Sequence, residues 1–337
     1  MKKVTTTYFF ILMLLIGSVR AQQRPAYTQY ILNNYLLNPA LTGIENYTDV
    51  KLGHRRQWTG IEGAPTTSYF TIHAPISAGF LDGDATGLPP GGATNPMSRL
   101  YTQNYEAAAP HHGIGMMVVH DVSGPTSQTN ITASYAYHLG LAPKVNLAVG
   151  VAGGMAYSSL NSSMLSFESD FDPYLNTGTF SKWNPDLSLG VWGYSSNWYV
   201  GASIQQILPQ TLYFHNEASQ SKTVPHYFVT GGIKVFLTED VTLLPSALLK
   251  ITQPASPTYD INAKLAFRDR LWIGGSYHKN DSFGAMLGIN INSLFNVGYS
   301  YDYTTSPLRT VSNGTHEIVL GILLNNRYKL LNPQIAF

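Results

Sequence analysis

Apolar and polar residues alternate one by one along many short segments of this chain. In the segment 294–303, one face carries large side chains, namely Phe295, Val297, Tyr299, Tyr301 and Tyr303. The other face carries small or polar ones, namely Asn296, Gly298, Ser300 and Asp302. The segments 130–139, 144–157 and 197–206 show the same alternation. A period of two predicts β-strands whose two faces meet different surroundings.

About fourteen such segments follow one another, and a tilted strand crosses a bilayer with about 9–11 residues. They cover residues 48–58, 66–74, 113–120, 130–139, 144–157, 184–194, 197–206, 226–236, 240–250, 259–267, 270–278, 282–290, 294–303 and 315–324. We therefore predict an all-β fold, a transmembrane up-and-down antiparallel β-barrel of about 14 strands with periplasmic N- and C-termini. A soluble β-sandwich or propeller is the competing architecture, and it would need more charged outer faces.

The connections between the segments favour the barrel. If the first strand runs outward, the outer connections are long, and most periplasmic ones are tight turns such as Ser195-Ser196 and Arg268-Asp269. This asymmetry is typical of bacterial outer-membrane barrels. The connection 75–112 breaks the rule, because it is long and falls on the periplasmic side. It is either an insertion or the sign of a strand miscounted nearby.

Composition narrows the class of protein and of partner. Charged residues make up 12% of the chain, against about 25% in a soluble domain. A net charge of +1 offers no basic surface for nucleic acid. The chain has no cysteine, which excludes disulfides and thiolate metal sites. Asp82–Gly87 imitates the start of a calcium loop, but Ala93 stands where the loop needs Glu, so we expect no metal and no cofactor.

The N-terminus has the pattern of a secretory signal peptide. Two lysines precede an apolar stretch from Tyr8 to Ile16, and small residues at 19 and 21 precede Gln22. Such a stretch is too short to span a membrane as a helix. We expect its removal and an integral location in the bacterial outer membrane. The predicted parts are a signal peptide (1–21), a periplasmic or plug-like segment (22–47), the barrel (48–324, with the insertion-like connection 75–112) and a tail (325–337).

One group of polar residues near strand ends is the main candidate for a cluster in the lumen or at the rim. It consists of Arg55, Arg56, Glu62, Asp302, His316 and Glu317. A charge facing lipid at the membrane midplane costs about 2–4 kcal/mol, so both arginines should avoid it, with Glu62 as a candidate partner. His316 and Glu317 are adjacent and point to opposite faces, so one of them can meet Asp302 across a hairpin. A Ser-His-acid hydrolase would need an aligned serine, and none stands out, so we expect no catalytic residue.

Two further groups are candidates for contacts outside the barrel wall. The segment before the first strand is too polar to face lipid, and we expect it to fold into the barrel mouth or to dock a periplasmic partner, with a plain leader as the alternative. Its candidate partner-facing motif consists of Tyr27, Gln29, Tyr30, Asn33, Asn38 and Pro39. Trp58, Tyr301 and Tyr303 stand at strand ends and are candidate aromatic residues of the membrane interface.

Several blocks of residues together resemble the PorP/SprF family, outer-membrane proteins of the type IX secretion system in Bacteroidetes. The first half supplies Tyr27–Tyr30, Asn33-Asn34, Asn38–Gly43, Arg55–Pro65, Ala74–Ile76, Asp121, Gly124-Pro125, Tyr135–Tyr137 and Asp172-Pro173. The second half supplies Pro225–Tyr227, Leu244–Ser246, Asp260–Asn262, Gly298–Asp302 and Gly314–Ile318. The blocks occur in family order over nearly the whole mature chain. The segment 81–110 is longer than the family leads us to expect.

The resemblance implies a role that alternation alone does not reveal. It implies a component that supports secretion or surface anchoring of cargo proteins, including the adhesin-like cargo of gliding motility, and that is not an enzyme. The implied partners are other type IX components, the C-terminal domain of the cargo and membrane lipid. We expect the outer loops around 158–183 and 207–225 to contact cargo, and the N-terminal segment and the connection 75–112 to face the periplasm. The alternative is a channel for small or hydrophobic solutes.

Overall fold

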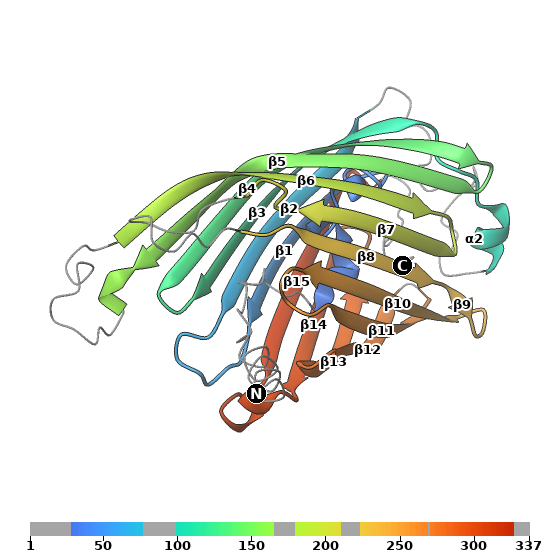
Figure 1. Cartoon of the computed structure of the whole chain (residues 1–337). Coiled ribbons are helices and arrows are strands. Elements are labelled where there is room, and N and C mark those ends of the chain that lie inside the picture. The colour runs from blue at the N-terminus through green and yellow to red at the C-terminus, as the bar shows by residue number, and fades with distance from the viewer. Residues whose placement is uncertain (1–27, 77–98, 165–178, 210–222, 269, 327–337) are drawn as a thin grey trace, which may run out of the picture.

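The computed structural model describes residues 28–76, 99–164, 179–209, 223–268 and 270–326 (Figure 1). All pairings are antiparallel, and nearly all of them join strands that are neighbours in sequence order. The strands are β1 (Thr48–Arg56), β2 (Thr66–Ile76), β3 (His111–Ser123), β4 (Thr126–Ala142), β5 (Val145–Asn161), β6 (Thr179–Tyr194), β7 (Trp198–Gln205), β8 (His226–Ile233), β9 (Val235–Phe236), β10 (Val241–Thr252), β11 (Thr258–Phe267), β12 (Leu271–His278), β13 (Ser282–Asn290), β14 (Phe295–Thr304) and β15 (Thr315–Leu324).

The sheet closes on itself into a barrel of 14 strands. The closing seam joins β1 to β15, from Thr48 opposite Leu324 to Arg56 opposite His316. β8 and β9 both pair with β10 in one register and count as a single interrupted strand. The interruption lies opposite Leu244 and Pro245 of β10, where proline has no N–H to donate to the ladder. The predicted barrel and its strand number are thus confirmed.

Strands β3 to β6 are longer than the alternation predicted. β4 and β5 have 17 residues each, and their pairing continues to Thr126 opposite Leu160. The additional residues, such as Ser127 and Ser159, are polar on both faces, so the apolar–polar alternation stops before the pairing does. β6 pairs with β7 only over Leu189–Tyr194, so its first half extends past β7 (Figure 1).

The two ends of the barrel differ in their connections. We call the end with the connections 57–65, 206–225 and 305–314 the long-loop end, and the end with 143–144, 195–197 and 268–270 the short-turn end. β1 begins at the short-turn end. The connection from β2 to β3 also lies there, and among the described residues it contains the short helix α2 (Arg99–Asn104). The predicted insertion at 81–110 and the calcium-like segment Asp82–Gly87 fall largely or wholly outside the described residues.

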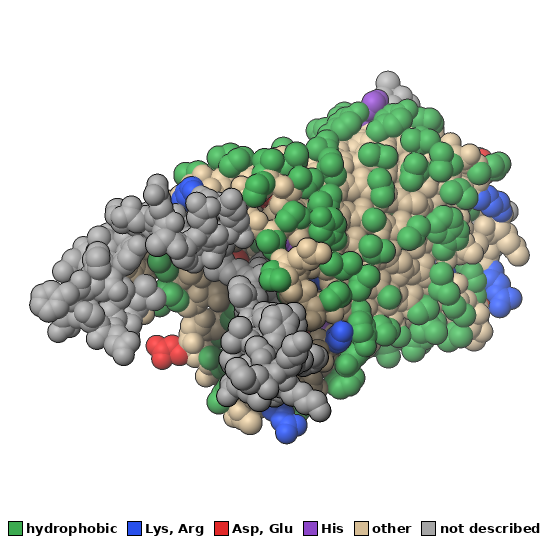
Figure 2. Space-filling model, viewed as in Figure 1, with side chains coloured by type: hydrophobic (Ala, Val, Ile, Leu, Met, Phe, Trp, Pro, Cys, Tyr) green, Lys and Arg blue, Asp and Glu red, His purple; other side chains and the backbone are tan. Residues whose placement is uncertain are grey.

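The outer face of the wall is apolar, and the inner face is small or polar. On β5, Val149 and Val151 point outward and are 50% and 38% exposed, whereas Ala148 and Ala152 point inward and are buried. Figure 2 shows apolar side chains spread over the outer surface of the barrel. The buried residues therefore gather in the lumen, where a chain segment fills the space between the walls. No helix in the described parts of the chain is long and apolar enough to cross a membrane.

Candidate functional site

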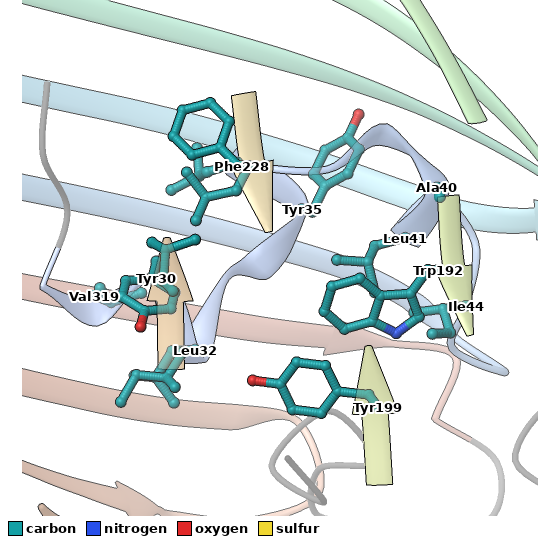
Figure 3. Packing of buried hydrophobic residues seen from close by; sticks show 14 of the residues in the cluster. Tyr30, Leu32, Tyr35, Ala40, Leu41, Ile44, Trp192, Tyr199, Phe228 and Val319 are labelled. Carbon is teal, nitrogen blue, oxygen red and sulfur yellow. The ribbon is translucent and has the colours of Figure 1, made fainter. Parts of the chain in front are cut away.

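The segment 28–47 lies inside the barrel, and we call it the plug. It forms three short 3-10 turns, η1 (Gln29–Leu32), η2 (Asn34–Leu36) and η3 (Pro39–Leu41), and continues directly into β1. Its apolar side chains are almost completely buried; Tyr30, Ala40 and Leu41 are at most 2% exposed. Figure 3 shows them among wall side chains from distant strands, including Trp192 and Tyr199. The described part of the segment that was expected to fold into the barrel mouth or to dock a periplasmic partner thus supplies much of the core.

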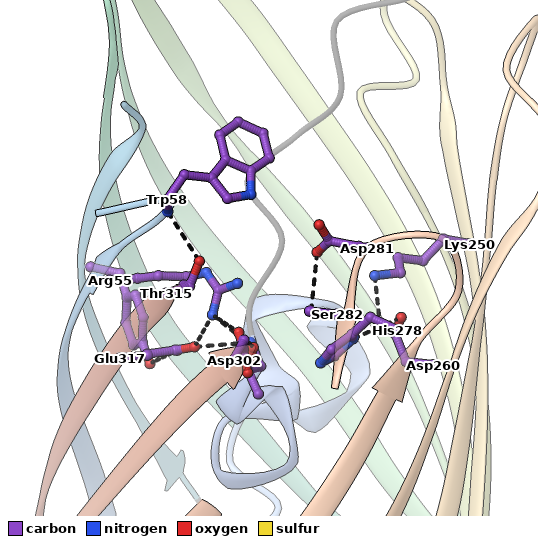
Figure 4. Close-up of polar contacts among 12 residues, drawn as sticks. Arg55, Trp58, Lys250, Asp260, His278, Asp281, Ser282, Asp302, Thr315 and Glu317 are labelled. Atoms are coloured by element: carbon purple, nitrogen blue, oxygen red, sulfur yellow. Dashed lines mark hydrogen bonds and ion pairs between the residues drawn. The ribbon is translucent and has the colours of Figure 1, made fainter. Parts of the chain in front are cut away.

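A buried ionic cluster anchors the start of the plug. Arg55 of β1 places Nη1 3.0 Å from Asp302 Oδ2 of β14 and 3.0 Å from Glu317 Oε2 of β15 (Figure 4). Thr28 joins the cluster, since its backbone N–H donates to Glu317 Oε2 at 2.9 Å and its hydroxyl donates to Asp302 Oδ2 at 2.5 Å. Arg55 in turn donates to the Thr28 hydroxyl at 2.7 Å. Buried charges persist only when paired and hydrogen-bonded, and the plug completes this pairing.

Glycines on the inner face let the plug touch the wall's backbone. A Cβ added at Gly150 of β5 would lie 2.4 Å from the Pro39 carbonyl oxygen. One at Gly190 of β6 would lie 1.9 Å from Asn38 Oδ1, and one at Gly113 of β3 would lie 2.0 Å from the Thr42 carbonyl oxygen. No other residue fits at such distances without displacement of the plug. Three strands therefore form a glycine cradle, defined by Gly113, Gly150 and Gly190.

Side-chain amides fix the plug within the cradle. Asn38 donates through Nδ2 to the carbonyls of Val191 at 2.9 Å and Ala202 at 3.2 Å, while its Oδ1 accepts from the Ala40 N–H at 2.9 Å. That last bond caps the turn η3. From the wall, Gln205 donates to the carbonyls of Leu36 and Leu37 at 3.1 and 2.9 Å. The 3-10 turns leave backbone groups without partners of their own, and the Gln205 amide of the wall satisfies two of them.

Three histidines hold the end of the plug near the short-turn end. His73 accepts from the Gly43 N–H at 3.2 Å, and Nε2 of His111 lies 3.1 Å from the Gly43 carbonyl oxygen. His138 stacks on His111 with ring centroids 4.4 Å apart, and its Nε2 lies 2.8 Å from the Thr42 carbonyl oxygen. We call His73, His111 and His138 the histidine clasp. It binds backbone atoms, so it fixes the path of the chain and not a particular side chain.

Other titratable groups around the plug are also enclosed. Burial raises the pKa of the Glu45 carboxyl well above its usual range, with nearby Asp49 raising it further and Lys51 opposing this. Burial also raises the pKa of the Tyr35 hydroxyl to about 12, although its bond to Ser134 acts in the other direction. On β10 and β11, Lys250 and Asp260 form a second ion pair, and Nδ1 of His278 on β12 lies 3.0 Å from Asp260 Oδ1 (Figure 4). Ion pairs therefore lie in the lumen at more than one place around the plug.

Comparison with known proteins decides the family. A family model described as "Type IX secretion system membrane protein PorP/SprF" matches residues 19–322. The chain belongs to this family. No curated protein matches it.

Among solved structures, several membrane barrels are similar at low identity. The toluene transporter TbuX of Ralstonia pickettii is 10% identical, with a TM-score of 0.48, over 87% of this chain and 92% of that one. The outer membrane protein Omp33 of Acinetobacter baumannii is 9% identical, with a TM-score of 0.46, over 84% and 100%. A FadL homologue of Pseudomonas aeruginosa is 9% identical, with a TM-score of 0.47, over 88% and 93%.

Residue blocks that carry the family resemblance meet at the plug. The block Asn38–Gly43 is the part of the plug that lies in the glycine cradle and the histidine clasp. Asn262, from the block on β11, donates to the Tyr30 hydroxyl of the plug. The blocks on β1, β14 and β15 supply the ionic cluster at Thr28. Segments far apart in sequence thus share one structural task, which is to seat the plug.

Of the six residues predicted for the polar cluster, the structure brings three together. Arg55, Asp302 and Glu317 meet in the lumen, and the partner of Arg55 is not Glu62, which is exposed in the connection after β1. Arg56 follows Arg55 and therefore points outward. His316 also lies on the outer face, where its Nδ1 is 2.7 Å from the Tyr299 hydroxyl. Adjacent residues of a strand point to opposite faces of the wall, so Arg56 and His316 lie outside while Arg55 and Glu317 lie in the lumen.

The predicted partner-facing motif lies largely inside the lumen. Tyr30, Asn33, Asn38 and Pro39 are buried against the wall, so their side chains are not presented to an outside partner in this conformation. Asn33, for instance, donates to the Thr71 hydroxyl at 3.0 Å. Gln29 begins η1, and Tyr27 falls outside the described residues.

The three predicted interface aromatics lie near the long-loop end. Tyr301 and Tyr303 are on the outer face of β14, and Tyr303 is 59% exposed. Trp58 follows β1, is half-buried, and its backbone N–H donates to the Thr315 hydroxyl at 3.1 Å. Their role at a membrane interface stays a prediction.

The sequence reasoning missed the glycine cradle and the histidine clasp. A signal for both was present, because Gly150 and His138 stand on the small or polar faces of alternating strands. Alternation predicts small inner residues because side chains from opposite walls would collide, whereas at these positions the plug is what leaves no room for a larger side chain. Within the described residues, no group of acidic, histidine or cysteine side chains is arranged to hold a metal.

Proposed function

We propose that this type IX secretion component is an outer-membrane barrel that supports the secretion or surface anchoring of cargo proteins, including adhesin-like cargo of gliding motility. The observation that carries the proposal is the plug, which fills the lumen with the chain's own residues. A barrel so filled suits a docking or anchoring component better than a passage for solutes. The membership in the type IX family supplies the process.

The outer-membrane location has a physical basis in the wall. The outer face carries large apolar side chains at alternating positions of every sector, for example Ile114, Val191, Leu287 and Ile318, each 45–51% exposed. A closed barrel also leaves no unpaired strand edge in hydrocarbon. Lipid is therefore the proposed partner of this face. The signal peptide expected at 1–21 would direct export, and it falls outside the described residues.

For cargo we propose contacts at the long-loop end. The first half of β6 extends there past β7, and the paired polar ends of β4 and β5 offer hydroxyl and amide groups. The connections expected to contact cargo, 158–183 and 207–225, lie partly outside the described residues. The partner would be the C-terminal domain of secreted cargo, with other type IX components at the periplasmic face, where the connection 75–112 belongs.

A catalytic role is not part of the proposal. Of the candidate cluster Asp302, His316 and Glu317, His316 faces outward and Asp302 faces the plug, so the barrel wall separates the histidine from this carboxylate. Arg55 and Thr28 occupy the inward carboxylates. Nucleic acid is likewise not a proposed partner, because the net charge is +1.

Deletion of the gene tests the role in secretion. We expect loss of type IX cargo from the cell surface and medium, restored by the wild-type gene on a plasmid. The abundance of unrelated outer-membrane barrels serves as the control for general envelope damage. Unchanged secretion and anchoring, in a strain whose parent contains the folded barrel in its outer membrane, would refute the proposal.

A reconstituted bilayer separates the proposal from the channel alternative. We expect the purified barrel to show almost no steady conductance, because the plug obstructs the lumen. Steady conductance of the size known for open barrels of similar diameter, together with solute flux into liposomes, would favour the channel. Capture of cargo from gently solubilised outer membranes, identified by mass spectrometry, is expected to return proteins with type IX C-terminal domains.

A further inference from the structure

Four basic side chains share one region of the outer wall near the long-loop end, and we call them the outer basic patch. They are His54 and Arg56 of β1, His120 of β3 and His316 of β15. Arg56 lies directly opposite His316 across the closing seam, and His54 is two residues before Arg56 on the same face. Ser68 of β2 stands opposite both His54 and His120, so the patch continues across four neighbouring strands (Figure 1).

Hydroxyl groups hold each histidine ring of the patch by one nitrogen. In every case Nδ1 lies within hydrogen-bond distance of a hydroxyl on the next strand: His54 with Ser68 at 2.9 Å, His120 with Thr129 at 2.8 Å, and His316 with Tyr299 at 2.7 Å. A hydroxyl that donates to Nδ1 selects the tautomer that carries its proton on Nε2. Each ring therefore keeps an Nε2–H that can donate to a group outside the wall.

No acidic side chain balances the patch on this part of the outer face. The outward positions of β1, β2, β3, β4, β14 and β15 contain neither aspartate nor glutamate. Asp302 and Glu317 belong to these strands, but they point into the lumen and pair there with Arg55. The outward side of these strands thus offers a guanidinium and N–H donors, and its charge complements an anion.

The patch lies where the apolar band of the wall ends. One step closer to the middle of the barrel, the next outward residues on the same strands are Leu52, Val118 and Ile318. An arginine that faces lipid costs little near the membrane interface and much at the midplane. Lipid headgroups lie directly outside the hydrocarbon layer. The patch is therefore at the depth where an embedded wall meets the phosphates of the lipid.

We propose that the outer basic patch binds the phosphate of an anionic lipid headgroup in the leaflet at the long-loop end. Arg56 pairs with one phosphate oxygen, and the Nε2–H groups of His54 and His316 donate to the others. His120 lies two strands from His54, about 10 Å away, and extends the site along the headgroup. The proposal rests on the membrane location proposed for the wall and names the class of lipid at one site on it.

Binding of defined lipids to the purified barrel tests the site. The barrel in a neutral detergent is titrated with phosphatidylglycerol, with phosphatidylcholine or with inorganic phosphate, and native mass spectrometry gives the dissociation constant of the first bound molecule. The variants are Arg56→Gln, Arg56→Lys and His316→Gln. Lys279→Gln is the matched control, because Lys279 is a cation at the same end of the barrel whose Nζ lies over the Tyr259 ring, away from the patch. Insertion into phosphatidylcholine vesicles shows that each variant is folded.

We expect the wild-type barrel to bind phosphatidylglycerol more tightly than phosphatidylcholine. Arg56→Gln should weaken the binding of phosphatidylglycerol about fivefold, which is the contribution of one cation near anionic lipid. His316→Gln should weaken it as well, whereas Arg56→Lys should retain most of the affinity and Lys279→Gln all of it.

Equal affinity for the two lipids would overturn the proposal, and so would an equal loss in Arg56→Gln and Lys279→Gln. Inorganic phosphate that displaces phosphatidylglycerol at equal concentration would also overturn it, because the site would then hold a free anion. Should Arg56→Gln fail to fold, His316→Gln decides between the same outcomes. Failure of the membrane location is a separate result, since the wild-type barrel would then not insert into phosphatidylcholine vesicles.

Discussion

Substitution of Gly150 by alanine should loosen the plug without altering the wall. The added Cβ would lie 2.4 Å from the Pro39 carbonyl oxygen and 2.5 Å from the Ala40 nitrogen, both backbone atoms of the plug. Non-bonded heavy atoms attract best at about 3.5–4.0 Å, so the plug must retreat by about 1 Å. The end of a flexible side chain could move aside by changing rotamer. The backbone of a turn that contacts the wall on both sides cannot move without losing those contacts.

The expected cost follows from overpacking in well-packed cores, which is about 1–3 kcal/mol. At about 1.4 kcal/mol per factor of ten, the opening equilibrium of the plug should rise about 5- to 150-fold. Hydrogen exchange with mass spectrometry measures this opening at the amides of Leu41 and Thr42, which are hydrogen-bonded within the plug. Bilayer conductance should rise in parallel, because the plug obstructs the lumen.

Gly153→Ala is the matched control. It lies on the same strand, faces outward, and a Cβ there meets nothing within 4 Å. Both substitutions change the backbone entropy of β5 similarly, so any difference between them reports the plug contact. Equal exchange rates in the two variants, with the barrel folded in both, would refute the claim that Gly150 is small because the plug passes there.

Three further predictions concern the contacts that seat the plug. Arg55→Met leaves two buried carboxylates without their cation and should destabilise the folded barrel by about 3–5 kcal/mol in urea titrations, whereas the exposed neighbour Arg56→Met should change stability by less than about 0.5 kcal/mol. Asn38→Ala removes the amide's bonds to carbonyls of β6 and β7, leaves the buried Ala40 N–H without its acceptor, and should cost about 1–3 kcal/mol, seen as faster exchange in the plug with unchanged exchange in β12 and β13. The pKa of Glu45 is raised in the folded state, so the folded state binds the proton more tightly and stability should fall as the pH rises above about 4.3, the unfolded value. Glu45→Gln should flatten that dependence of the unfolding midpoint, and an unchanged slope would show that this carboxyl is not its source.

Strand positions could be predicted because alternation records the environment of each face locally. Val149 and Ala148 differ in type because one faces outward and the other faces the lumen. Strand ends could not be predicted where both faces are polar, as at Ser127 and Ser159. The alternation signal vanishes there, although backbone pairing, which does not depend on the side chain, continues.

The ionic cluster was only partly predictable for a related reason. Adjacent residues on a strand face opposite ways, which settles that only one of His316 and Glu317 can meet Asp302. The choice of Glu317 depends on which face of β15 is inside, and the register with β1 and β14 decides it. Glu62 was a plausible partner for Arg55 in sequence, but Glu317 lies directly opposite Arg55 across the closing seam.

By itself the sequence determined the barrel, its strand number and the asymmetry of its ends. Local alternation predicts the strands, and the lengths of the connections between them predict how the two ends differ. It also carried, in residue blocks, the resemblance to the family to which the chain belongs. Only the tertiary structure decided where the segment 28–47 lies and in which direction it runs, because its position depends on contacts with walls that are remote in sequence. Gly150, His138 and Arg55 all contact the plug, and this common role is visible only in the closed barrel.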